Sequence, residues 1–404
     1  MGVRKLNKFL INRDIIKTYY SIQEFINNLK ISKITRSENI NNCLLKSDIS
    51  NISDISDVSN SNVPSPNKNN THNGKIVIAV DFWLYAHKFL HSGRTDNILL
   101  GFWNQIMKFL SYGIIPMYVM DGSVPIEKFG KIEERKNKNR KQKKKIDDIN
   151  NEINKIFRYS EIDGIDNRRI VNNALEKMCA KREKIQKQIK RIKTTELCNI
   201  YKLFNVLNIP YVKAEFEADA LCAKLYKEKI ITCCLSDDMD MLVLGCGSTI
   251  KFNEGKLIEF NLEHIKESLG LNQEQFIDMC IMFGCDYLQH PLKMDCEDAY
   301  NMIKTHGSLL EALCSNKHEL FNMSNRNVNV IGEAYYQVKE IYMNSCDKEY
   351  IPSKLKNIKM QKINFSDVVV FLNKLKWFDT SSKNLRLIES ELYTINKMID
   401  NDEL

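Results

Sequence analysis

The chain has 404 residues, 43% of them hydrophobic, so it is long enough to bury a large core in one large or two smaller domains. No apolar run approaches the roughly 20 residues that span a bilayer, which excludes a membrane protein. The twelve cysteines include no Cys-x2-Cys pair and no signal peptide is present, which argues against a disulfide framework or a zinc ribbon. We therefore expect an intracellular protein that is not secreted. The formal net charge of +8 favours a polyanionic partner.

The first 74 residues predict two different kinds of segment. Residues 1–30 open with MGVRKLNKFL and have a helical pattern to about Leu29. Residues 31–74 are rich in Asn, Ser and Asp and contain SNSNVPSPNKNNTHNG, which indicates a loosely packed, polar, low-complexity insertion. We therefore expect the folded domain to resume at Lys75.

Four apolar runs predict the strands of a sheet. KIVIAVD (75–81) and PMYVMDG (116–122) enclose a helical stretch, and IPYVKAE (209–215) and IITCCLSDD (230–238) repeat this pattern around the helix-like EFEADALCAKLYKE. Alternating strands and helices predict an α/β fold with a largely parallel central sheet flanked by helices. Between the two pairs of strands lies a long basic region, and the C-terminal part has a helical pattern.

Acidic residues stand where these strands end. Three of the four strands end at carboxylates and the fourth leads into EFEAD, and sites in such sheets form at the carboxyl ends of the strands. Seven carboxylates are expected to converge there: Asp81, Asp121, Glu217, Asp219, Asp238, Asp240 and Asp286. Such a set repels strongly unless a cation neutralises it, and oxygen ligands suit Mg²⁺ or Mn²⁺. Any single member is, taken alone, more often a helix cap or a surface ion pair.

These motifs together resemble the flap endonucleases and their XPG-type relatives, structure-specific 5′ nucleases of DNA replication and repair. The resemblance is carried by MGV at the start and by VDFWLYAHKFL, GIIPMYVMDG, IPYVKAEFEADALCA, SDDMDMLVLG and LNQEQFIDMCIMFGCDYL. It covers most of Lys75 to about Met302, and all seven positions that carry metal-site carboxylates in the family are acidic here.

The resemblance implies roles for particular residues. The seven carboxylates would hold two divalent ions, Mg²⁺ or in its place Mn²⁺. Lys128 and Arg135, seven and fourteen residues after Asp121, would be the catalytic cations at the scissile phosphate. Further DNA contacts are expected at Gly2, His87, Arg140, Lys141, Lys143, Lys144 and Lys145, the last five in a helical arch through which a single-stranded 5′ end is threaded. The open alternatives are a solvated basic run and, for His87, a plain surface histidine.

The nuclease is accordingly expected in three segments, residues 1–30, 75–122 and 209–290, separated by the insertion 31–74 and the arch 123–208. Residues 291–404 correspond to a degenerate helix-hairpin-helix element and C-terminal helices. Lys293, Met294 and Asp295 stand where the family has a Gly-x-Gly turn that grips the downstream duplex, so we expect a weaker grip. No Gln-led motif with paired aromatics follows, so binding to a sliding clamp is not predicted, and a monomer is expected.

The resulting hypothesis is a metal-dependent, structure-specific 5′ nuclease that hydrolyses DNA at 5′ flaps, nicks or ends. Exonuclease, gap and Holliday-junction activities stay open, as does the choice between DNA and RNA in the removed strand. The alternative is a catalytically silent relative that serves as a scaffold for nucleic acids or proteins; loss of two or more metal carboxylates would indicate it, and none is lost. The expected location is the nucleus, or a cytoplasmic replication site if the chain is viral.

Overall fold

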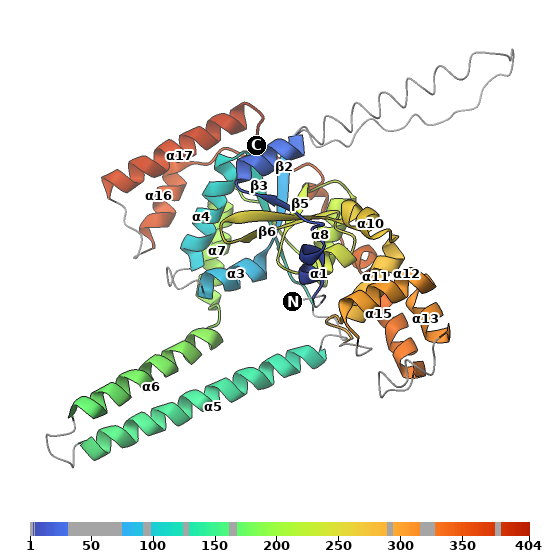
Figure 1. The fold of residues 1–404 in the computed structure, drawn as a ribbon. Coiled ribbons are helices and arrows are strands. Elements are labelled where there is room, and N and C mark those ends of the chain that lie inside the picture. The colour runs from blue at the N-terminus through green and yellow to red at the C-terminus, as the bar shows by residue number, and fades with distance from the viewer. Residues whose placement is uncertain are drawn as a thin grey trace.

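The computed structural model describes Val3 and residues 5–30, 75–91, 98–123, 129–160, 168–288, 294–315, 328–375 and 381–404. The predicted insertion lies outside these ranges, as do three residues with predicted roles: Gly2, Lys128 and Lys293. Figure 1 shows a central sheet with helices on both sides and a long helical hairpin that projects away from it.

A seven-stranded sheet forms the centre of the described part, in the order β1-β7-β6-β5-β2-β3-β4. Its strands are β1 (Lys17–Tyr19), β2 (Ile76–Asp81), β3 (Ile114–Met120), β4 (Tyr211–Lys213), β5 (Cys233–Leu235), β6 (Ser248–Asn253) and β7 (Lys256–Asn261). All pairings from β6 through β5, β2 and β3 to β4 are parallel, whereas β7 pairs antiparallel with β6 and β1. This confirms the predicted α/β fold with a largely parallel sheet.

Helices cover both faces of the sheet, which is why β2 and β3 are almost continuously apolar. On one side lie α3 (Phe82–His91), α4 (Ile98–Ser111) and α7 (Thr194–Val206), and on the other α8 (Ala218–Lys227), α9 (Asp240–Val243) and α11 (Gln273–Phe283). Val80 of β2 lies opposite Leu235 of β5, and Asp81 lies opposite Val119 of β3. The carboxyl ends of the three central strands therefore meet at one edge.

The first 30 residues differ from the predicted helical segment. α1 (Leu6–Asn12) is followed by β1 and then by a helix over residues 22–30. β1 pairs with β7, and the Tyr19 hydroxyl donates to the buried Glu259 carboxylate at 2.7 Å. The helical prediction is wrong over β1, because an edge strand depends on its distant partner strand more than on its own periodicity.

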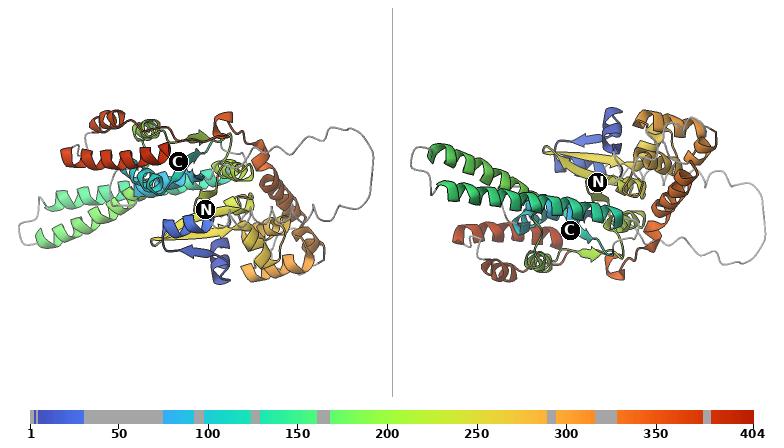
Figure 2. Two further views of the ribbon diagram at one scale, coloured as in Figure 1. Left: turned by 90° about the horizontal axis from the view of Figure 1, so that it is seen from above. Right: turned by 90° about the horizontal axis from the view of Figure 1, so that it is seen from below.

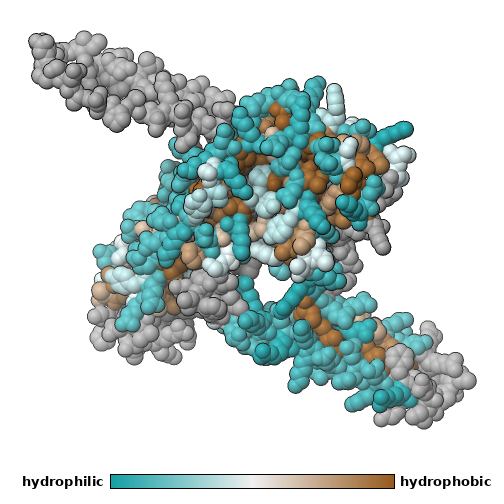
Figure 3. Space-filling model, turned by 180° about the vertical axis from the view of Figure 1, so that it is seen from behind, coloured by the Kyte–Doolittle hydropathy of each residue, from teal (hydrophilic) through white to brown (hydrophobic). Residues whose placement is uncertain are grey.

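The basic region forms a hairpin of two long helices, α5 (Phe129–Ser160) and α6 (Arg168–Ile189). Ile146, Ile149 and Ile153 are buried at helical spacing on α5, which packs against α6, and Arg182 of α6 donates to Asn150 at 3.3 Å. Figure 3 shows the hairpin as a largely hydrophilic arm with a hydrophobic stripe along it. A narrow apolar seam thus holds together an arm whose other faces are charged.

The C-terminal helices lie on both sides of the core (Figure 2). α10 (Leu262–Leu269) leads from β7 to α11, and α12 (Cys296–His306), α13 (Leu309–Ser315) and α15 (Val328–Lys348) pack around α11. After the short η3 (Ser353–Leu355), α16 (Phe365–Asn373) and α17 (Ser382–Asp400) pack beside α7 and α4. None of the helices described is long and apolar enough to cross a membrane.

The predicted degenerate turn leads into an intact helix. Asp295 caps α12 by accepting the Asp298 N–H at 2.9 Å, and Glu297 pairs with Arg13 of the N-terminal segment. These two acidic side chains thus have structural partners, and α12 and α13 are both retained.

Candidate active site

Asp81 stands at the carboxyl end of β2, next to the loop that follows β5. Its Oδ1 accepts the Leu84 N–H at 3.1 Å in the first turn of α3, and its Oδ2 accepts the Ser236 hydroxyl at 3.1 Å. Burial is the main cause that raises the pKa of Asp81 to about 7, and the negative charges of Asp121 and Asp238 add to it. Asp81, Asp121 and Asp238 therefore form a first carboxylate group whose members repel one another.

The three aspartates that follow β5 have three different environments. Asp237 turns to α3, where it pairs with Lys88 at 2.7 Å. Asp238 is held by two local bonds: its N–H donates to the Ser236 hydroxyl oxygen and its Oδ1 accepts the Asp240 N–H, both at 3.0 Å. Asp240 is buried. Of these three aspartates, Asp237 thus forms an ion pair, whereas Asp238 and Asp240 belong to the acidic set at the sheet edge.

The segment after β3 lies against the segment that leads into α8. Asp121 Oδ1 accepts the N–H of Ala218, the first residue of α8, at 3.0 Å. The Gly122 N–H donates to the Phe216 carbonyl at 2.8 Å. A Cβ on Gly122 would lie 2.1 Å from the Ala214 carbonyl oxygen, so a side chain here would push the two segments apart. This close approach brings Asp121 to the acidic pair at the start of α8.

A second carboxylate group consists of Glu217, Asp219 and Asp240, whose negative charges all act on the Tyr287 hydroxyl. Tyr287 donates to Glu217 Oε2 at 2.7 Å. Burial first, and then the negative charges of Glu217, Asp240 and Asp219, raise the pKa of Tyr287. Tyr342 of α15 donates to Asp240 Oδ1 at 3.1 Å. Two tyrosines therefore orient the members of this group.

Asp286, three residues beyond α11, lies close to α5 of the helical hairpin. Arg135 Nη2 lies 3.9 Å from Asp286 Oδ2, and the Arg135 side chain is 61% exposed. On α3, His87 is exposed and its ring stacks on that of His91. Burial, and then the positive charges of His91 and Arg135, lower the pKa of His87. Arg135 and His87 are thus at the same edge as the acidic residues.

The other predicted DNA contacts lie further along α5. Arg140 donates to Asn137 at 3.2 Å. The remaining members are all exposed to solvent: Lys141, Lys143, Lys144 and Lys145. Gly2 and Lys128 lie outside the described residues, so their positions stay predictions.

The donor set fits a hydrated divalent cation. In the part of the chain that is described, no group of three or more His, Cys, Asp or Glu side chains is already arranged to hold a metal ion. Mg²⁺ keeps several waters and is usually held by one or two carboxylates together with substrate phosphates, so paired carboxylates suffice. Burial first, and then the charges of Asp121 and Asp238, raise the pKa of Asp81, so a bound cation would stabilise its ionised form.

Four residues at this edge escaped the sequence analysis. Ser236 and Tyr287 stand beside acidic motifs, so a search for hydroxyls next to those motifs would have found them. Tyr342 and Glu349 come from α15 and the residue after it, more than 100 residues from the carboxylate and the backbone that they contact. No local pattern in the sequence points to them.

Two family models match this chain: the XPG N-terminal domain over residues 58–144 and the XPG I-region over residues 208–286. Together these ranges contain all seven acidic residues at the edge. These two matches support the XPG-type flap endonuclease family for this chain.

Similarity to flap endonucleases extends beyond the two matched regions. Flap endonuclease 1 of Dictyostelium discoideum is 29% identical over 335 residues, which cover 76% of this chain and 77% of that protein. Flap endonuclease 1 of Osmerus mordax is 30% identical over 257 residues, 58% of this chain and 60% of that protein. The catalytic core of Rad2 in complex with DNA substrate is 18% identical, covers 80% of this chain and 92% of its own, and has a TM-score of 0.54, which establishes a shared fold.

Proposed function

We propose that this chain is a metal-dependent, structure-specific 5′ nuclease that hydrolyses DNA phosphodiesters at 5′ flaps, nicks or ends. The observation that carries the proposal is the convergence of the two carboxylate groups and Asp286 at one sheet edge, next to the exposed Arg135. Acidic residues on one side and a basic arm on the other match the two needs of phosphodiester hydrolysis, a cation site and a grip on a polyanion.

Two divalent cations, Mg²⁺ or in its place Mn²⁺, are proposed to be held by the first and second carboxylate groups with Asp286. Such ions, when bound, activate a water and stabilise the attacking and leaving oxygens at the scissile phosphate. The chain's own hydroxyls keep the donors oriented. Ser236 donates to Asp81 at 3.1 Å, Tyr287 to Glu217 at 2.7 Å and Tyr342 to Asp240 at 3.1 Å.

Arg135 is proposed to contact the scissile phosphate. Its ion pair with Asp286 is long, at 3.9 Å, and largely exposed, so the guanidinium can exchange that partner for a phosphate at little cost. The exposed lysines of α5 are proposed to hold the backbone of the single-stranded 5′ end without reading its sequence. The proposed partner is DNA, and a monomer is expected to bind it.

The scaffold alternative is not favoured. A silent relative has no reason to keep mutually repelling carboxylates, because burying a charge destabilises the fold unless it is paired. All seven acidic residues are present, and Asp81 has a strongly raised pKa of about 7. A labelled 5′-flap duplex, incubated with the protein in Mg²⁺ or in excess chelator, separates the two functions. Binding of the flap without cleavage in Mg²⁺ or Mn²⁺ would support the scaffold.

Asp238→Asn tests the site itself, with Asp237→Asn as the matched control from the same loop. Asp238→Asn should abolish cleavage and leave flap affinity within a few-fold, since it removes a proposed metal ligand and leaves the basic arm intact. Asp237→Asn removes the ion pair with Lys88 and should keep most of the cleavage. Near wild-type cleavage by Asp238→Asn at saturating Mg²⁺ would refute the assignment of the site.

A further inference from the structure

A buried carboxylate that is not among the seven predicted acidic residues lies close to the sheet edge where those residues meet. Glu349, the residue after α15, is only 2% exposed. Its Oε2 accepts the N–H of Glu215 at 2.8 Å, and its Oε1 accepts the N–H groups of Phe216 at 3.1 Å and Glu217 at 3.0 Å. Three successive backbone N–H groups that converge on one anion form an anion-binding concavity. Both oxygens of Glu349 are therefore engaged with the segment that ends in Glu217.

The opposite side of this segment contacts the residues that follow β3. The Phe216 carbonyl accepts the Gly122 N–H at 2.8 Å, and the Glu215 carbonyl accepts the Ser123 N–H at 2.9 Å. Residues 215–217 are thus held between Glu349 on their N–H side and residues 122–123 on their carbonyl side. A displacement of residues 215–217 therefore moves a member of each carboxylate group, Glu217 directly and Asp121 through its neighbour Gly122.

Glu349 is itself anchored to elements of the active edge. Lys224 of α8 donates to the Glu349 carbonyl at 2.7 Å. Seven residues earlier on the chain, Tyr342 of α15 donates to Asp240. The C-terminal end of α15 therefore contacts both acidic motifs of the second carboxylate group, one through a side chain and the other through backbone N–H groups.

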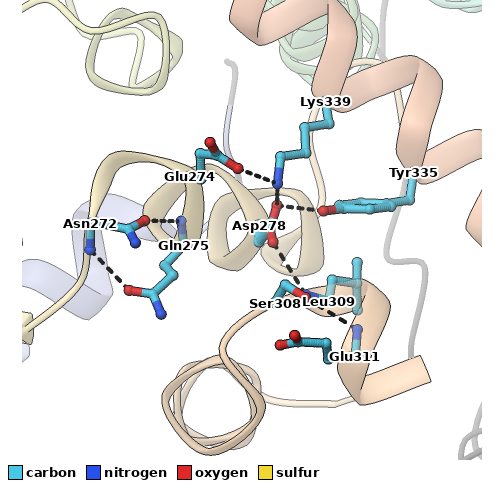
Figure 4. A network of polar contacts seen from close by, with 9 residues as sticks. All are labelled: Asn272, Glu274, Gln275, Asp278, Ser308, Leu309, Glu311, Tyr335 and Lys339. Atoms are coloured by element: carbon cyan, nitrogen blue, oxygen red, sulfur yellow. Dashed lines mark hydrogen bonds and ion pairs between the residues drawn. The ribbon is translucent and has the colours of Figure 1, made fainter. Parts of the chain in front are cut away.

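The middle of α15 is fixed to α11 by a separate buried network (Figure 4). Lys339 Nζ lies 3.1 Å from Asp278 Oδ1, and the Tyr335 hydroxyl donates to the same oxygen at 2.7 Å. Asp278 Oδ2 accepts the Leu309 N–H of α13 at 3.2 Å. This network sets the position of α15 without touching residues 215–217. Asp278 is therefore a second buried carboxylate that contributes to the packing of α15, and its substitution serves as a control for the substitution of Glu349.

We propose that Glu349 is a positioning residue of the metal site: it holds residues 215–217 so that Glu217 and Asp121 stand where they bind a divalent cation. The inference rests on the proposed function, because it presumes that these carboxylates bind metal. Both oxygens of Glu349 accept backbone N–H groups of this segment, so the proposed role of Glu349 is to hold the backbone and not to bind the cation itself. Its effect on the site is transmitted through the backbone.

Two substitutions remove the contacts in steps. Glu349→Gln keeps one carbonyl oxygen, which can accept the N–H groups of Phe216 and Glu217, and places an NH₂ group against the N–H of Glu215. Glu349→Ala removes all three bonds. Asp278→Asn is the matched control, since it disturbs the other buried carboxylate contact of α15. The measurement is Mn²⁺ affinity of the DNA-free protein by electron paramagnetic resonance of free Mn²⁺, together with thermal unfolding in chelator.

The expected result is graded. Glu349→Ala should lower Mn²⁺ affinity by about 10–100-fold, Glu349→Gln by less, and Asp278→Asn by no more than about threefold, as for partners that orient metal ligands. If Glu349→Ala fails to fold, the comparison of Glu349→Gln with Asp278→Asn decides. Wild-type Mn²⁺ affinity in the folded Glu349 variants, or an equal loss in Asp278→Asn at a similar unfolding temperature, would overturn the proposal. Flap cleavage by the wild-type protein, measured in parallel, tests the proposed function separately, because the Mn²⁺ measurement requires no cleavage.

Discussion

Replacing Asp81 with Asn should stabilise the metal-free protein while it destroys the site. Asn has the same shape, its oxygen can accept the Leu84 N–H, and its NH₂ group can donate to the Ser236 hydroxyl, so both contacts of Asp81 survive. What disappears is a buried negative charge next to Asp121 and Asp238. The variant therefore isolates the cost of keeping that charge at the edge.

The size of the effect follows from the pKa of Asp81. Each tenfold change in the ionisation constant corresponds to about 1.4 kcal/mol, so a rise in the pKa from 3.8 to about 7 corresponds to about 4 kcal/mol. Because the folded carboxyl binds its proton more tightly than the unfolded one, the ionised form destabilises the fold increasingly as the pH rises from about 4 to about 7. Relaxation of Asp121 and Asp238 lowers the expected difference to about 2–4 kcal/mol at pH 8.

Urea unfolding in excess chelator, at several pH values between 4 and 8, measures this difference. The variant should be more stable than the wild type at pH 8, and the two should converge near pH 4. Saturating Mn²⁺ should stabilise the wild type by mass action and the variant much less. A variant that is equally or less stable at every pH, or that gains as much from Mn²⁺ as the wild type, would refute the electrostatic account of this edge.

Three further predictions concern the arm, the loop and the duplex grip. Arg135→Ala should slow single-turnover cleavage at saturating enzyme by about 100-fold or more with little loss of flap affinity. An arm variant should instead weaken flap binding and reduce the slope of log K against log salt concentration by about 3. Equal losses of cleavage and binding in both variants would contradict the separate roles. The arm variant neutralises four exposed lysines: Lys141, Lys143, Lys144 and Lys145. Gly122→Ala, whose Cβ would lie 2.1 Å from the Ala214 carbonyl oxygen, should lower both the free energy of unfolding and Mn²⁺ affinity, and unchanged values in both would show that the loop yields freely. Cleavage should fall only gradually as the downstream duplex is shortened, because Asp295 caps α12 at the position of the missing glycine turn, and a steep loss that also depends on K⁺ would show a retained grip.

Much of this protein could be predicted from local pattern. Apolar runs such as Ile76–Asp81 and Ile114–Met120 are typical of strands covered on both faces, and each leads to a carboxylate. Parallel strands place such residues at one edge, which is why the convergence of these carboxylates was predictable before any contact was known. The basic composition of the arm likewise favoured a polyanionic partner.

The tertiary structure decided which partners each of these residues contacts, because contacts between distant segments leave no periodic signal in the sequence. Asp237 and Asp238 are adjacent and chemically identical, yet only packing against α3 gives the first to Lys88 and leaves the second at the edge. β1 became a strand because β7 offered it a free edge. Glu349 lies 132 residues beyond the Glu217 N–H that it accepts, and only the return of the chain through α15 could bring the two together.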